Sequence, residues 1–238
     1  MTDDHPIVTP KIYPLGMDAL VIQFARTVSD AASAAVQFMT AKLQGNRHEG
    51  IVEIAPALAS LLVRFDPNRV SRQTLNSWLT TLCADHDWSQ LALPKSKRTW
   101  EIPVCFDGDA APDLAEVADV IGCDPSKIIA EILSAELRVL AIGFAPGQPY
   151  IGMLPEHWNI PRKSAITAEV PAGALVTAVR QLVLFANPSP TGWRQLGLTA
   201  FRPFDLSAQD PVALRAGDAM TFVQASQSDI SALRDSED

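Results

Sequence analysis

Apolar and polar positions follow two alternating patterns over about the first ninety residues. The apolar run at 19–24 predicts a buried strand, and shorter runs at 51–54 and 61–65 predict two more. Ser29 and Ser71 are suitable caps for two helices, the first over residues 31–43 and the second with large apolar residues on one face. The order strand, helix, strand, strand, helix is typical of a split βαβ unit. Residues 9–93 are therefore expected to form a ferredoxin-like α+β domain.

After residue 98 the pattern changes to short apolar runs separated by loops rich in proline and glycine. A strand is expected over residues 99–106, followed by two short helices that begin near Pro112 and at Pro125, because proline suits the first helical turn. The later runs have no helical stretch between them, which favours a β-barrel or a sandwich over residues 98–224. These later runs cover residues 138–142, 174–179, 182–186, 195–198 and 219–223.

Two polar stretches fall outside these domains. Residues 94–98 contain three basic side chains and a proline and predict a linker. Residues 225–238 are polar and acidic, so they predict an unstructured tail.

The densest cluster of proline and glycine lies between residues 143 and 152, where it is interleaved with Phe144 and Tyr150. Proline lacks a backbone donor and glycine lacks a packing side chain, so we expect a fixed loop here and neither a helix nor a central strand. Residues 187–193 form a second such run, which ends in Trp193. Two rigid loops with aromatic side chains predict the walls of a pocket. Its expected lining residues are Gly143, Phe144, Pro146, Gly147, Pro149, Gly152, Ser189, Pro190, Gly192 and Trp193.

The charge distribution favours a small anionic ligand. The formal net charge of −8 disfavours binding to nucleic acid or to an anionic membrane. Between residues 157 and 203, however, five basic residues stand against Glu169 alone, a local balance of +4. Arginine binds carboxylates and phosphates in bidentate fashion, although such side chains can also simply face water. The five basic residues are Arg162, Lys163, Arg180, Arg194 and Arg202.

Several single residues have two interpretations each. Gln181 could donate a hydrogen bond in the pocket or be a polar residue at a strand edge, and Trp193 could fill the core or stack on a ligand. The hydroxyl of Tyr150 needs a partner in either setting. His157 is expected on a surface loop and Asp218 in a turn, more than in acid–base chemistry. No catalytic residue is assigned.

Common site motifs are missing from the sequence. It contains no P-loop, nucleophile elbow, glycine-rich dinucleotide loop or zinc motif, so no metal site is expected. The widely spaced Cys83, Cys105 and Cys123 predict reduced thiols of a cytoplasmic protein. No apolar run is long enough to span a bilayer, and the polar residues 1–10 are not expected to act as a signal peptide.

The order and spacing of the loop motifs resemble one protein family. It comprises allophanate hydrolase subunit 1, the B subunit of bacterial 5-oxoprolinase, the carboxyltransferase subdomain C and D, and an inhibitor of a sporulation histidine kinase. The resemblance covers nearly the whole chain and is most specific from residue 143 to residue 218. It rests on Gly143-Phe144-x-Pro146-Gly147-x-Pro149-Tyr150-x-Gly152, Pro161-Arg162-Lys163, Val170-Pro171-Ala172-Gly173, Gln181, Ser189-Pro190-x-Gly192-Trp193, Gly197-x-Thr199, Pro203-Phe204-Asp205 and Gly217-Asp218.

This resemblance implies a fold, partners and an activity. The fold would be a small ferredoxin-like α+β domain followed by a cyclophilin-like β-barrel. The partners would be a homologue of subunit 2 or of the C subunit, together with a LamB-like third subunit, in a complex that uses ATP to open the lactam ring of 5-oxoproline. The chain would then be a hydrolase subunit, inactive alone, of a 5-oxoprolinase or allophanate hydrolase type, with ATP bound by it or by its partner.

The resemblance also implies roles for single residues. Arg162, Lys163 and Arg180 would bind anionic groups, while Gln181 and Tyr150 would orient the amide or carboxylate substrate. Two alternatives stay open, namely a regulatory binding protein of the histidine-kinase-inhibitor type and a carboxyltransferase piece of a biotin-dependent enzyme.

The chain departs from the usual family residues at positions expected to surround one pocket. A usual histidine, tyrosine and arginine are replaced by leucine, an aromatic residue before the Pro-Tyr pair is replaced by glutamine, and a Gly-Gln-Thr-Gly run is altered on both sides of its glutamine. The altered positions are Leu133, Leu137, Gln148, Arg180, Leu182, Val183, Thr191 and Leu198.

Overall fold

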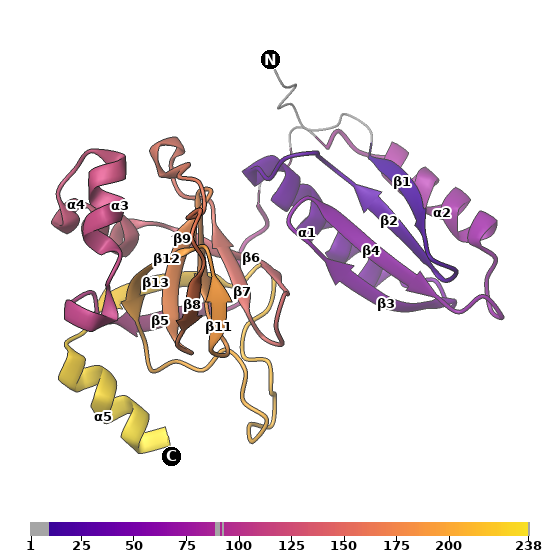
Figure 1. The fold of residues 1–238 in the computed structure, drawn as a ribbon. Helices are drawn as coiled ribbons and strands as arrows, with labels where there is room; N and C mark the ends of the chain where they lie inside the picture. The colour runs from indigo at the N-terminus through magenta and orange to yellow at the C-terminus, as the bar shows by residue number, and fades with distance from the viewer. Residues whose placement is uncertain (1–9, 89–90, 92, 238) are drawn as a thin grey trace. The chain divides into compact units, whose positions relative to one another are not determined.

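The computed structural model describes residues 10–88, 91 and 93–237, which divide into two compact units, Met1–Lys95 and Ser96–Asp238 (Figure 1). Residues 1–9 of the polar N-terminus lie outside the described part. Of the residues described, no helix is long and apolar enough to cross a membrane.

In the N-terminal unit, two helices pack on one face of an antiparallel sheet with strand order β1-β2-β4-β3. Leu20 and Ile22 of β2 and Leu61 and Val63 of β4 are buried in the core that the helices cover. Because β4 lies between β2 and β3, the unit has the predicted split βαβ arrangement. Its elements are β1 (Lys11–Leu15), β2 (Ala19–Gln23), α1 (Asp30–Gly45), β3 (Ile51–Pro56), β4 (Ser60–Phe65) and α2 (Arg72–Ala84).

Local sequence explains where these elements start. The side chains of Ser29 and Ser71 accept hydrogen bonds from the backbone N–H groups of Ala32 (3.2 Å) and Thr74 (3.0 Å), so both predicted helix caps are present. Strand β1 was not predicted from the sequence. It is largely exposed and contains Pro14, which is tolerated because β1 is an edge strand.

The C-terminal unit is a barrel built from a seven-stranded sheet of order β12-β9-β10-β7-β6-β13-β5. Its two end strands meet where Cys105, just after β5, and Leu198 of β12 exchange two backbone hydrogen bonds of 2.9 Å. Gly197 makes this closure possible, because a Cβ atom there would lie 2.5 Å from Cγ1 of Val104. The predicted α+β fold class with a cyclophilin-like barrel is thus confirmed.

The elements of this unit follow one another from Ser96 to the end of the chain (Figure 1). They are β5 (Thr99–Val104), the 3₁₀ turn η1 (Gly108–Ala110), α3 (Leu114–Ile121), α4 (Pro125–Ser134), β6 (Leu137–Ile142), β7 (Pro149–Gly152), the 3₁₀ turn η2 (Glu156–Trp158), β8 (Thr167–Val170), β9 (Ala174–Ala178), β10 (Gln181–Leu184), β11 (Ser189–Thr191), β12 (Arg194–Leu198), β13 (Ala219–Gln224) and α5 (Gln227–Glu237).

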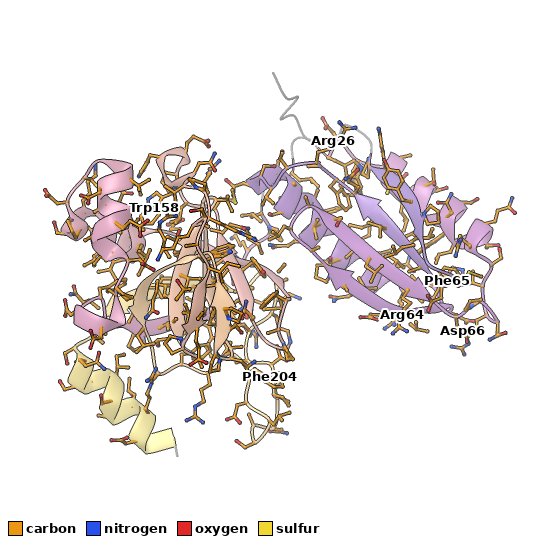
Figure 2. All side chains as sticks on the ribbon, viewed as in Figure 1. Arg26, Arg64, Phe65, Asp66, Trp158 and Phe204 are labelled. Atoms are coloured by element: carbon orange, nitrogen blue, oxygen red, sulfur yellow. The ribbon has the colours of Figure 1, made fainter. Side chains whose placement is uncertain are left out.

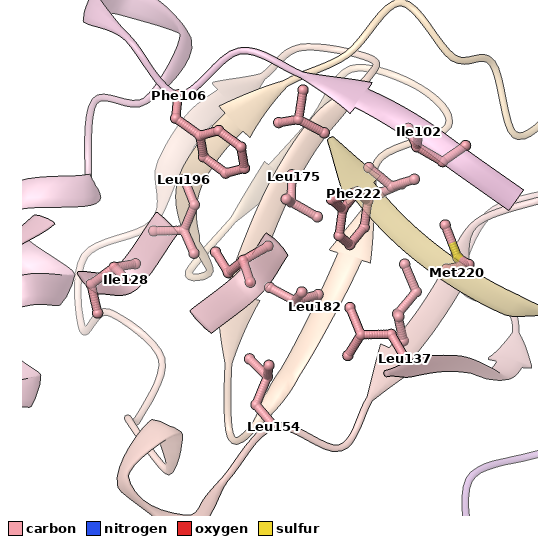
Figure 3. Close-up of a cluster of buried hydrophobic side chains, with 14 of the residues drawn as sticks. Ile102, Phe106, Ile128, Leu137, Leu154, Leu175, Leu182, Leu196, Met220 and Phe222 are labelled. Carbon is pink, nitrogen blue, oxygen red and sulfur yellow. The ribbon is translucent and has the colours of Figure 1, made fainter. Parts of the chain in front are cut away.

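The barrel interior is filled by large aliphatic and aromatic side chains (Figure 3). Leu175, Leu182 and Leu196 come from three neighbouring strands, and Phe222 closes the opposite wall. Helices α3 and α4 add Val117, Ile128 and Ile132 to the same cluster. This core is continuous from the barrel interior to the helices, so it fixes the strands that carry the candidate site.

Three sequence expectations are wrong. Residues 149–152 form β7, the middle strand of the seven, because proline is acceptable as the first residue of a strand. Residues 189–191 of the second loop form β11, which pairs with β8. The acidic end of the chain is helical as α5, and Ile230 anchors it with no exposed surface.

Two carboxylates tie distant segments of the barrel unit together. Buried Asp218 accepts hydrogen bonds from Nε (2.9 Å) and Nη2 (2.5 Å) of Arg98, from Nε1 of Trp100 (3.2 Å) and from the backbone N–H of Arg215 (2.8 Å). The predicted turn residue is therefore also a structural anchor between the first and last strands of the unit.

The second carboxylate, Glu131 of α4, binds the turn η2. Its Oε2 lies 2.7 Å from Nε1 of Trp158 and 2.7 Å from Nε2 of His157. Partial burial alone would raise the pKa of Glu131, but the hydrogen bonds from Trp158 and His157 and the nearby positive charges outweigh it and lower the pKa. His157 thus has a partner on the protein surface, as its predicted loop position suggests.

Candidate functional site

The outer face of the barrel sheet carries a second, smaller group of buried side chains, which we call the outer cluster. It consists of residues that alternate with interior positions, so Leu182 and Leu184 of β10 face the interior while Val183 and Phe185 face outward. Trp193 packs into this cluster with 6% of its surface exposed. The outer cluster comprises Val170, Ala174, Val176, Ala178, Val183, Phe185 and Trp193, with Tyr150 and Leu198 partly buried against it.

The aromatic rings of Tyr150 and Trp193 meet edge to face in the outer cluster. Their ring centroids lie 6.1 Å apart at an interplanar angle of 76°. Tyr150 reaches this position from β7, opposite Val183 of β10. Burial raises the pKa of Tyr150 and the charge of Arg162 opposes that shift only in part, so the hydroxyl is protonated at neutral pH and can donate a hydrogen bond.

Arg162 lies over the exposed side of this aromatic pair. The Cζ atom of its guanidinium is 5.3 Å from the centre of the Trp193 ring, within the range of a cation–π interaction. The backbone holds it there, because the N–H of Lys163 donates to the carbonyl of Gly192 (2.7 Å). A Cβ on Gly192 would lie 3.1 Å from the carbonyl oxygen of Lys163, so this glycine permits the close approach of the two segments.

Gln181 is buried on the same face of β10 as Val183. Only 4% of its surface is exposed, and its Nε2 has no hydrogen-bond partner within the described protein. A buried amide donor without a partner costs about 1–3 kcal/mol, so the retention of glutamine here points to a ligand for that N–H group. Gln148 has a similar buried oxygen without a partner, but it precedes Tyr150 on β7 whereas Gln181 lies beside Gly152, beyond Tyr150.

Two of the predicted anion-binding residues are engaged elsewhere. Nζ of Lys163 contacts Oδ1 of Asp113 at the start of α3 and lies 3.8 Å from Glu116. Nε of Arg180 donates to the carbonyl of Leu154 (2.8 Å), and its Nη1 binds Oε2 of Glu156 (2.6 Å).

Arg194, another member of the predicted basic group, is nearly buried and pairs with Glu116 at 2.9 Å. Its Nη1 also donates to the carbonyl of Pro161 (2.6 Å). Together with Lys163, it fastens the segment that carries Arg162 to helix α3. The local positive charge is therefore largely balanced by acids that are distant in sequence, and Arg162 is the predicted residue that remains over the aromatic pair.

The turn at Val179 and Arg180 explains why Arg180 points away from the outer cluster. Both residues have positive φ angles, 46° and 65°, and they form the two-residue connection between β9 and β10. Such a turn matches the twist of a hairpin, but L-residues adopt it at an energetic cost. The two hydrogen bonds of the Arg180 guanidinium to residues 154–156 hold the strained turn in place.

The first predicted loop divides between two places. Pro149 and Gly152 belong to β7 and lead to the outer cluster, whereas Gly147 packs against another loop. Gly147 has a φ of 73°, and a Cβ there would lie 2.6 Å from the carbonyl oxygen of Pro203 and 2.7 Å from Cβ of Phe204, which Figure 2 labels. Phe144 is 77% exposed, so it is not a pocket wall. Gly143 and Pro146 lie in this same outer part of the loop.

The second predicted loop contributes mainly through its end. Ser189 pairs with Val170 in the β11–β8 ribbon, and Pro190 is exposed. Thr191 accepts a hydrogen bond from the backbone N–H of Trp193 (3.1 Å) and so orients the indole.

With the geometry in place, comparison with known proteins identifies the family. A sequence profile described as carboxyltransferase domain, subdomain C and D, matches residues 10–214. The chain belongs to this family. It is 30% identical over 232 residues to the B subunit of 5-oxoprolinase from Bacillus subtilis, covering 94% of this chain and 97% of the relative.

Solved structures of the carboxyltransferase subdomain C and D family agree with this fold. The structure of TTHA0988 matches with a TM-score of 0.72 and 30% identity, over 87% of this chain and 40% of that chain. This chain thus spans less than half of TTHA0988. The urea amidolyase of Kluyveromyces lactis matches with a TM-score of 0.69 but 15% identity, over 97% of this chain and 16% of that chain, which indicates a shared fold alone.

The departures from the usual family residues do not surround one pocket, as the sequence suggested. Leu137 and Leu182 are part of the barrel core, and Leu133 packs against it. Val183 and Leu198 belong to or adjoin the outer cluster. Most of the replaced polar residues thus became interior packing, while the aromatic pair and Arg162 kept their family motifs.

Metal binding finds little support in the described part of the chain. Among residues 10–88, 91 and 93–237, no group of three or more His, Cys, Asp or Glu side chains is arranged to hold a metal ion. Arg162, Tyr150, Gln181 and Trp193 can therefore offer a guanidinium, a hydroxyl, an amide donor and an aromatic face, which suits recognition of a small carboxylate or amide.

Proposed function

We propose that this chain is the B-type subunit of an ATP-dependent complex that hydrolyses a cyclic amide, with 5-oxoproline as the substrate. The observation that carries the proposal is the near full-length similarity to the B subunit of 5-oxoprolinase from Bacillus subtilis. At this level of identity and coverage, a shared role in the same kind of complex is the simplest interpretation. The chain would be inactive without its partners.

The outer cluster suits the chemical groups of 5-oxoproline. That molecule has a carboxylate, a planar lactam and a small apolar ring. Arg162 would bind the carboxylate, Nε2 of Gln181 would donate to the lactam carbonyl oxygen, and the faces of Trp193 and Tyr150 would contact the ring. A donor to the carbonyl oxygen stabilises the negative charge that develops there when the ring opens.

We further propose that ATP binds outside this chain. The sequence has no glycine-rich phosphate loop, and the described residues hold no carboxylate group suited to a metal ion that would accompany a nucleotide. These residues therefore do not fit ATP, and a homologue of the C subunit or a LamB-like third subunit would provide that site. The name of the Bacillus relative, which makes it one subunit of several, supports partners of this kind.

The proposal is tested by reconstitution. The chain is co-expressed with candidate C-type and LamB-like partners, purified by size exclusion, and assayed for ATP-dependent release of glutamate from 5-oxoproline. Activity of the complex, and none of the separated chain, is the expected result. A stable complex without turnover would reject 5-oxoproline as the substrate. The absence of any complex would reject the subunit role and favour the regulatory alternative.

Variants of Arg162 test the assignment of the site within an active complex. Arg162→Ala should raise the KM for 5-oxoproline by about tenfold or more, because a charge-assisted hydrogen bond to the carboxylate is lost. Arg162→Lys should recover part of this loss. Arg64→Ala, at an exposed arginine paired with Glu53 in the other unit, is the control and should leave KM unchanged. Equal KM values for all variants would overturn the assignment of Arg162.

A further inference from the structure

A cleft of about 420 Å³ opens at the end of the barrel where β9 begins and where β10 and β12 end. It is separate from the residues assigned to the outer-face site, none of which lines it. Its walls include Pro171, Phe185, Phe201 and Pro203, and its volume lies in the range of about 300–1,000 Å³ that small-molecule sites occupy.

Two arginines line this cleft, and no acidic residue is among its lining residues within the described structure. Arg202 comes from the loop after β12, and Arg234 comes from helix α5. The nearby carboxylate of Asp205 has a lowered pKa, mainly through hydrogen bonds from Ser207 and least through the charge of Arg202. The cleft therefore has a local positive charge on a chain whose net charge is −8.

The position of Arg234 is fixed by the helix that was expected to be an unstructured tail. Ile230, one helical turn before Arg234, is fully buried against Cys105, Ala110 and Ala200. Nη2 of Arg234 donates to the carbonyl of Thr199 at 3.1 Å, which uses one of the five N–H donors of the guanidinium. Helix α5 thus brings a charged group over the floor of the cleft.

Glycine shapes the floor of the cleft. Gly173 has a φ of 80°, and a Cβ there would lie 2.3 Å from the carbonyl oxygen of Thr199 and 3.4 Å from Nη2 of Arg234. Its N–H donates to the carbonyl of Phe185 (2.8 Å), and its carbonyl accepts from the N–H of Thr199 (2.9 Å). This one residue joins three of the segments that form the cleft and leaves room for the guanidinium above it.

We propose that the cleft is a second binding site, for a small organic anion that carries a carboxylate or a phosphate on a compact apolar body. Arg234 and Arg202 would bind the oxyanion, since guanidinium groups match both carboxylate and phosphate geometry. Phe185, Phe201 and the prolines would contact the apolar body. The site does not depend on the proposed lactam hydrolysis, because it shares no residue with the outer-face site.

The test uses NMR of the full chain with ¹³C-labelled alanine methyl groups. The methyls of Ala172, Ala186 and Ala200 line the cleft, and the methyl of Ala35 in the N-terminal unit reports non-specific effects. Benzoate, phenyl phosphate and neutral benzamide are titrated at constant ionic strength. Saturable shifts at the cleft methyls with benzoate or with phenyl phosphate are expected, and the comparison tells which oxyanion is preferred. Benzamide should cause none.

Substitutions at Arg234 decide whether the guanidinium binds the anion. Arg234→Gln should weaken binding of the preferred probe about tenfold, and Arg234→Lys should weaken it less. Arg64→Gln is the control at an exposed arginine of the other unit and should bind like the wild type. Shifts that do not saturate, shifts shared by Ala35, an equal response to benzamide, or unchanged binding by Arg234→Gln would each overturn the proposal.

Discussion

Replacing Gln181 by leucine separates the stability of the barrel from the function of the outer-face site. Leucine is close to glutamine in size and has no polar atoms, so it fills the same space on β10. Gln181 is 4% exposed, and its Nε2 lacks a partner within the described protein. A binding role and a structural role for this amide therefore give opposite results.

The expected gain in stability follows from the cost of the unpaired donor. A buried N–H group without a partner destabilises a fold by about 1–3 kcal/mol, and imperfect packing of leucine offsets part of the gain. We expect Gln181→Leu to raise the free energy of unfolding by about 1 kcal/mol, which corresponds to about 2–4 °C in Tm. In the reconstituted complex, loss of a donor to the reacting oxygen should lower kcat/KM by about a hundredfold.

A matched control lies in the other unit. Gln37 of α1 is also buried, and neither its Nε2 nor its Oε1 has a partner within the described residues. Gln37→Leu should therefore also raise stability in urea unfolding followed by circular dichroism, but it should not change kcat/KM. If Gln181→Leu lowers stability, the amide has a structural partner. If it raises stability without loss of activity, the substrate-binding role of Gln181 is wrong.

Four further predictions concern the barrel and its side chains. Asp218→Asn should lower the free energy of unfolding by about 2–3 kcal/mol, because a buried charge pair is broken, whereas the same change at exposed Asp210 should have little effect; equal effects would contradict this. Glu131 contributes stability above its unfolded-state pKa, near 4.5, that is lost as pH falls through its lower folded pKa, so Glu131→Gln should approach wild-type stability in acid; a constant difference from neutral to acidic pH would refute it. Gly197→Ala should destabilise the barrel closure, measurable as lower amide-exchange protection of β12. Burial raises the pKa of Cys83 to about 11, so its alkylation at pH 8 should be about a hundredfold slower than in unfolded protein; rapid alkylation of the folded chain would contradict this.

Periodicity and capping were enough to predict most of the fold. The caps at Ser29 and Ser71 and the alternation in β9 and β10 are local signals, and each gave the correct element. Strand β7 could not be predicted in this way, because its prolines and glycines are tolerated only at the place where neighbouring strands pair with it. Helix α5 has weak apolar periodicity, and its stability comes from Ile230 in a cluster formed by distant residues.

The candidate site was predicted in part. The sequence indicated Arg162, Tyr150, Gln181 and Trp193, and the fold brings them to one face of the barrel sheet. It could not show that Lys163 pairs with Asp113, fifty residues earlier in the chain. A local charge balance counts only neighbours in sequence, whereas a folded barrel neutralises charge through contacts between distant segments. Arg234 was missed for the same reason.

The altered family positions bear on the substrate more than on the presence of a site. Leu137 and Leu182 lie in the barrel core, so their apolar character strengthens packing behind the site without removing a group from it. Val183 and Leu198 adjoin the aromatic pair, and apolar side chains there make the surroundings of Arg162 and Gln181 less polar. A less polar setting strengthens a guanidinium–carboxylate contact and makes an unpaired amide donor more costly. The same substitutions that depart from the family should therefore favour a compact carboxylate with an apolar ring over a more polar, extended amide.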